Sequence, residues 1–68
     1  MAVYEMYEVS NPGSIRNKPD HIINANSLTA AKRAAKRLKM FHGTAIELYQ
    51  GGRLVTTWWN KRWNDVEE

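Results

Sequence analysis

The sequence has 68 residues, enough for one small domain, expected over 1–68, with a thin hydrophobic core. It contains no cysteine, which excludes disulfides and fits a reducing compartment, and its 43% of hydrophobic residues argues against disorder. The net charge of +3 is mildly basic, and neither a bilayer-spanning apolar run of ~20 residues nor a signal peptide is visible, so no membrane association is expected.

The first half of the chain predicts two strands and a helix. β-Branched and aromatic residues indicate strands over residues 2–10 and 21–25, and Gly13 with both prolines indicates a loop between them. Ser27 suits a helix N-cap and Gly43 suits the C′ position, so the helix is expected over 28–41. His42 is then expected to lie at the helix C-terminus, where it interacts with the dipole.

The second half predicts a β-hairpin, with strands 44–50 and 53–59 joined by a two-residue Gly51-Gly52 turn. Asn60-Lys61 is interpreted as a second tight turn before a last short strand, and 64–68 as a frayed tail. The fold class is therefore α+β: a small four- or five-stranded antiparallel sheet packed on one α-helix, in the order β-β-α-β-β with room for a further short strand. The expected core consists of Ile23, Leu28, Ala31, Ala35, Leu38, Ile46, Leu48 and Val55.

Half of the ten Lys and Arg residues lie on the predicted helix, with no acid among them. At ~100° per residue the alanines form one apolar arc, and the cations fill the opposite side. A solvated face is the ordinary interpretation. However, Lys32–Lys36 and Arg33–Arg37 are like-charged i,i+4 pairs, each of which repels by ~0.2–0.5 kcal/mol. This cost favours an anionic polymer as ligand, and phosphate contacts to duplex DNA are predicted. The predicted DNA-binding residues are Lys32, Arg33, Lys36, Arg37 and Lys39.

In a regular hairpin, Leu48 pairs with Val55 and Ile46 with Thr57, and this face is expected to cover the helix. The outer face then carries Trp58, joined by Trp63 from the last strand, and is unusually apolar for a small monomer. Three explanations stay open: the strands curl and the aromatics close the core, or the aromatics bind protein, or they stack on bases. The predicted protein-binding residues are Tyr49, Trp58, Arg62 and Trp63.

Catalytic chemistry finds little support. No nucleophile, base and orienting group form a recognisable set, and Gly51-Gly52 alone is a turn, not a phosphate loop. The acidic residues do not follow zinc or calcium ligand spacings. The sequence therefore predicts a binding protein, not an enzyme, with no metal and no cofactor.

Residues 27–44, "SLTAAKRAAKRLKMFHGT", together with Lys61-Arg62-Trp63 and Asp65, resemble the phage-associated anti-CRISPR family named ninth among the type I-F inhibitors. The resemblance covers most of the chain but is weak over residues 10–22. Between Tyr49 and Asn60 this chain is two residues shorter than the family pattern. The resemblance implies a single small domain whose antiparallel sheet half-wraps one helix.

The resemblance also implies a function. Members of that family bind backbone subunits of the crRNA-guided type I-F surveillance complex (Csy, or Cascade) and obstruct target-DNA hybridisation. Their helix cations are implicated in holding duplex DNA nonspecifically; Lys32, Arg33 and Arg37 match those positions, and Lys36 and Lys39 are additional. A monomer in the host bacterial cytoplasm is implied. The alternative is a free-standing nucleic-acid-binding phage protein, whose binding would fall steeply with salt.

Overall fold

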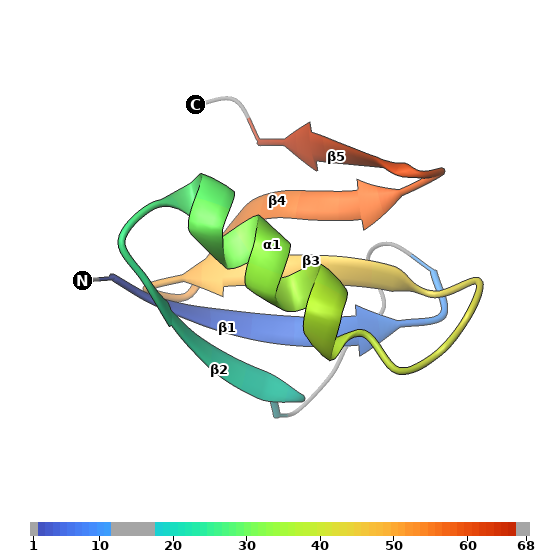
Figure 1. Ribbon diagram of the computed structural model, residues 1–68, viewed down its shortest axis with the longest axis horizontal. Helices are drawn as coiled ribbons and strands as arrows, with labels where there is room; N and C mark the ends of the chain where they lie inside the picture. Colours follow the sequence, from blue (N-terminus) through green and yellow to red (C-terminus); the bar gives the residue numbers. More distant parts are fainter. Residues whose placement is uncertain (1, 12–17, 67–68) are drawn as a thin grey trace.

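The computed structural model describes residues 2–11 and 18–66. Five strands form one antiparallel sheet in the order β2-β1-β3-β4-β5, and one helix lies across a face of it (Figure 1). The predicted α+β class is thus confirmed, whereas most of the predicted loop around Gly13 lies outside the described residues. The elements are β1 (Ala2–Val9), β2 (His21–Ala25), α1 (Leu28–Leu38), β3 (Ala45–Gln50), β4 (Arg53–Trp59) and β5 (Arg62–Asp65).

The core lies between α1 and the sheet. Ala31 and Ala35 are fully buried, and the small size of alanine lets the helix approach the strands closely. The prediction for Leu38 is wrong: this side chain is 37% exposed at the last helical residue, so its truncation leaves no closed cavity. The other predicted core residues are buried or packed at the edge of the core. The buried cluster consists of Tyr4, Met6, Ile23, Ala25, Ala31, Ala35, Ile46 and Leu48.

The two helix ends differ in how well the sequence predicted them. Ser27 caps the N-terminus as expected, because its Oγ accepts a hydrogen bond from the Ala30 N–H at 3.2 Å. At the other end the helix stops at Leu38, and Lys39 is already extended (φ −60°, ψ 127°). Gly43 has φ +76° but lies in a later turn, so its predicted C′ position and the dipole contact of His42 are wrong.

The predicted hairpin forms, but its register contains a β-bulge. Tyr49 pairs with Leu54 as expected, whereas Leu48 pairs with Thr56, which leaves Val55 as the extra residue of β4. One extra residue reverses the alternation of all residues after it. Trp58 therefore pairs with Ile46 and faces the helix, and the predicted pairs of Val55 and Thr57 are wrong.

The second predicted turn also forms. Asn60 and Lys61 both have positive φ, 55° and 64°, as a two-residue hairpin turn requires. Asparagine tolerates this conformation, but a lysine there is uncommon. Asn64 and Asp65 belong to β5 and are not the predicted tail, and the Val66 N–H donates to the Val55 carbonyl at 3.0 Å. This anchors the outermost strand to β4.

Candidate functional site

The basic side of α1 contains three exposed cations that can meet a ligand directly. Arg33, Lys36 and Arg37 are exposed and line an open hollow of about 500 Å³ on the helix surface. The Lys36 ammonium lies 4.2 Å from the ring centroid of Trp58. This cation–π contact helps to hold the lysine side chain in place. We call Arg33, Lys36 and Arg37 the basic face.

Lys32 is engaged within the protein. Its Nζ lies 2.7 Å from Oδ1 of Asp65 and 5.8 Å from the ring centroid of Trp63. The same carboxylate oxygen accepts a hydrogen bond from the buried Thr56 hydroxyl at 2.7 Å. The contact with Lys32, and then that with Thr56, hold the pKa of Asp65 below its usual value against a smaller effect of burial. Lys32 therefore joins α1 to β5, and a phosphate would compete with Asp65 for it.

Lys39 is engaged by a buried carboxylate, Glu8, whose side chain is only 5% exposed. Glu8 accepts hydrogen bonds from the Met40 N–H (3.1 Å), the Phe41 N–H (2.9 Å) and the Thr44 hydroxyl (2.7 Å). The Lys39 ammonium lies 3.6 Å from the carboxylate and also donates to the Phe41 carbonyl. Glu8 thus fixes the backbone that follows the helix, and explains why the helix stops before residue 41.

The pKa of Glu8 reflects two opposing influences. Burial favours the neutral acid and raises the pKa. The hydrogen bonds from Thr44, Phe41 and Met40, with the charge of Lys39, outweigh burial and leave the pKa below its ordinary value. The hydrogen bonds and the lysine around Glu8 therefore favour its ionised form.

The Glu8 contacts hold two large apolar side chains in water. Met40 is 72% exposed and Phe41 is 62% exposed, although their backbone is fixed by hydrogen bonds. We call this the Met40–Phe41 pair. The sequence does not predict this pair, because the helix expected over 28–41 places both residues in its last turn. The sequence signal that could have indicated this pair is the presence of two large apolar residues shortly before Gly43.

The predicted protein-binding residues do not form one surface. Trp58 and Trp63 face the helix, 5.5 Å apart between ring centroids, and are only half-exposed, so their predicted outer-face position is wrong. Tyr49 lies on the opposite face against Tyr7, with 5.1 Å between ring centroids. Burial, and then Glu47 and Tyr7, raise the pKa of Tyr49. Arg62 is exposed on β5. The part these residues play in binding stays a prediction.

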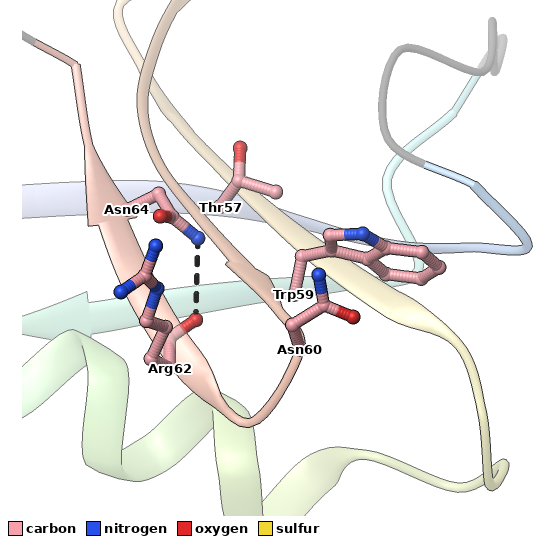
Figure 2. Close-up of a pocket in the computed structure, with 5 residues that line it drawn as sticks. All are labelled: Thr57, Trp59, Asn60, Arg62 and Asn64. Carbon is pink, nitrogen blue, oxygen red and sulfur yellow. Dashed lines mark hydrogen bonds between the residues drawn. The ribbon is translucent and has the colours of Figure 1, made fainter.

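Trp59, not Trp58, lies on the face of the sheet away from the helix. It pairs with Arg62, next to the pair of Thr57 and Asn64, and these residues with Asn60 line a hollow of about 280 Å³ (Figure 2). The side-chain amide of Asn64 donates to the Arg62 carbonyl at 3.4 Å. We call this the outer hollow. The bulge at Val55 places Trp59 there, and no local sequence signal marks that bulge.

Two other features, a cluster of metal ligands and a membrane-spanning helix, are not found among the residues that the structure describes. Within 2–11 and 18–66, no three His, Asp or Glu side chains gather as metal ligands would. Over the same residues, α1 lacks the length and apolar character needed to cross a bilayer.

The whole chain is similar to a protein of known structure. The solved structure of AcrIF9 matches it with a TM-score of 0.86 and 35% sequence identity, over 98% of this chain and 88% of that one. No protein-family model matches the sequence, and no curated protein matches it significantly. The likeness to AcrIF9 therefore extends over nearly the full length of both chains.

Proposed function

Since the chain belongs to the AcrIF9 family of anti-CRISPR proteins, we propose that it binds backbone subunits of a type I-F surveillance complex and obstructs target-DNA hybridisation. Binding, without catalysis, is the proposed activity. The observation that best supports a protein contact is the Met40–Phe41 pair, which stays in water on a backbone fixed by Glu8.

The Met40–Phe41 pair has the physical character of an interface anchor. Exposed apolar patches mark interaction sites, and aromatic residues and methionine are enriched in interface centres. The Glu8 contacts order the backbone before binding, so less conformational entropy is lost in the complex. Lys36, Lys39 and His42 lie around the pair and line a common hollow with it. The complementary surface is therefore an apolar depression with an acidic rim.

We also propose that the basic face holds duplex DNA nonspecifically on the inhibited complex. Arg33, Lys36 and Arg37 point to one side of α1 and can contact phosphates, which carry no direct sequence information. To contact a phosphate, Lys32 would have to leave Asp65 and Lys39 would have to leave Glu8. These two lysines are therefore secondary in this proposal. A free-standing DNA-binding protein is the alternative, and it rests on the basic face alone.

Phe41→Ser is expected to weaken binding to a purified type I-F surveillance complex by about 2 kcal/mol, roughly 30-fold, because a central aromatic anchor is lost. Size-exclusion chromatography at high salt, followed by a titration, measures this loss. High salt suppresses phosphate contacts. Co-elution of the protein with the complex at high salt therefore distinguishes an inhibitor from a simple DNA-binding protein.

Ile22→Ser is the matched control, since Ile22 is an exposed apolar residue on β2. It should bind like the unaltered protein. Equal binding by Phe41→Ser would contradict the role of the pair, and failure of the unaltered protein to bind the complex or to prevent target-DNA hybridisation would contradict the proposed function.

A further inference from the structure

A second hollow adjoins the outer hollow at the turn between β4 and β5. It has a volume of about 300 Å³ and is lined on one side by Lys39 and His42, which follow the helix, and on the other by Lys61 of the turn. Trp59 and Asn60 line both hollows. The two spaces therefore share one indole and one amide in their walls, and we call the second one the turn hollow.

The side chains around these hollows match an anionic ligand with a planar group. In the part of the chain that the structure describes, neither hollow is lined by an Asp or Glu, whereas Arg62 lines the outer hollow and three basic side chains line the turn hollow. The described lining of the outer hollow contains no aliphatic side chain, which disfavours an apolar peptide group. It offers an indole for stacking, with amide and hydroxyl groups for hydrogen bonds to a base edge.

These hollows continue the basic face around the end of the sheet. Lys39 and His42 line both the turn hollow and the space beside the Met40–Phe41 pair, which Lys36 also lines. Lys36 in turn belongs to the basic face. Basic side chains thus follow one another from α1 to the turn, as the phosphates of a bound strand do, although Lys39 is already engaged by Glu8. Lys61 also keeps a left-handed backbone, the kind of unfavourable conformation that tends to gather at binding sites.

We propose that the β4–β5 turn binds single-stranded nucleic acid, with one base stacked on Trp59 in the outer hollow. Arg62 holds the phosphate on one side of that base, and Lys61 with His42 holds the phosphate on the other. A base inside a duplex is already stacked and paired, so a duplex leaves this site empty. The site is separate from the proposed duplex contact on α1 and does not depend on any CRISPR complex.

The test uses the isolated protein with fluorescein-labelled oligo(dT), oligo(rU) and a mixed-sequence duplex, read by fluorescence anisotropy. Trp59→Leu is expected to weaken binding of both single strands about tenfold, because base–aromatic stacking is lost. It should leave duplex binding unchanged. Trp59→Phe keeps an aromatic ring and should retain most of the affinity, which separates stacking from a folding defect.

Arg62→Gln is expected to weaken single-strand binding and to reduce its salt slope by about 0.7, the value for one phosphate contact. Arg53→Gln is the matched control, since Arg53 is an exposed arginine at the opposite end of β4. Absence of single-strand binding by the unaltered protein, or equal losses for single strand and duplex with Trp59→Leu, would overturn the proposal. So would a Trp59→Leu variant that loses only its affinity for the surveillance complex, because the outer hollow would then hold protein.

Discussion

Replacing Arg33, Lys36 and Arg37 together by glutamate is expected to abolish the retention of duplex DNA by the inhibited surveillance complex. Each lost phosphate contact reduces the slope of log affinity against log salt by about 0.9, so three contacts account for about 2.7, and the new carboxylates add repulsion. The fold should survive, since all three side chains are exposed and the cation–π contact of Lys36 contributes only ~0.5–1 kcal/mol. DNA titrations at low and moderate salt measure the effect.

Two comparisons define the meaning of this result. The neutral triple variant with glutamine at the same positions removes the contacts without repulsion, and should show the lower salt slope with weak residual binding. Affinity for the complex itself should largely persist in the glutamine variant, because the Met40–Phe41 pair is unchanged. The glutamate variant should lose somewhat more, since Lys36 lies beside that pair and would face the proposed acidic rim. Wild-type DNA retention by the glutamate variant at both salt concentrations would show that the basic face does not hold DNA.

Glu8→Gln is expected to lower the free energy of unfolding by about 2–4 kcal/mol. The amide replaces one acceptor oxygen by a donor, so at least one of the Met40 and Phe41 N–H groups loses its partner, and the attraction of Lys39 is lost. Hydrogen bonds to a charged group contribute ~1.5–3 kcal/mol, and a buried donor without a partner costs ~1–3 kcal/mol. Urea denaturation measures the loss, which is large beside the ~5–15 kcal/mol of a typical domain.

The same carboxylate makes the loss dependent on pH. The pKa of Glu8 is lower in the folded protein than its ordinary value, so folding favours the ionised form. The contribution of ionised Glu8 to the free energy of unfolding is therefore complete above the pKa of an ordinary Glu, about 4.3. It is lost as the pH falls through the lower pKa that Glu8 has in the folded protein. The difference in free energy of unfolding between Glu8→Gln and the unaltered protein should therefore narrow as the pH falls below about 4.

Glu5→Gln, on the same strand but facing away from α1, is the control and should change stability little. Equal effects of the two substitutions would show that the Glu8 contacts do not support the fold.

Local signals in the sequence were sufficient for the elements themselves. Ser27 marks the helix start, Gly51-Gly52 marks the hairpin, and β-branched and aromatic residues mark β1, because each of these features depends on near neighbours in the chain. The helix end was mispredicted since a carboxylate 32 residues earlier captures the Met40 N–H. Such a contact exists only once β1 lies beside the end of α1.

The candidate site was harder to predict than the fold for the same reason. The charge pattern identified five cations but not which of them have internal partners; Asp65 and Glu8 engage two of them from distant strands. The sequence predicts Trp58 instead of Trp59 as the outward-facing indole of β4, because the bulge at Val55 depends on how β4 packs against β3 and α1. The alternation of residue types along one strand does not reveal that an extra residue is present.

The bulge has a consequence for how the pairing register of this hairpin can change during evolution. Residues 56–59 read Thr-Thr-Trp-Trp, two identical neighbours followed by two more. If β4 paired without the bulge and kept all its residues, Ile46 would lie opposite Thr57 instead of Trp58. Thr57 and Trp59 would then turn toward the helix and Thr56 and Trp58 away from it, so each face would keep one hydroxyl and one indole. The repeated residues therefore let the hairpin change register by one residue, and so change the surface it offers to a partner, without losing the indole that packs beside the helix.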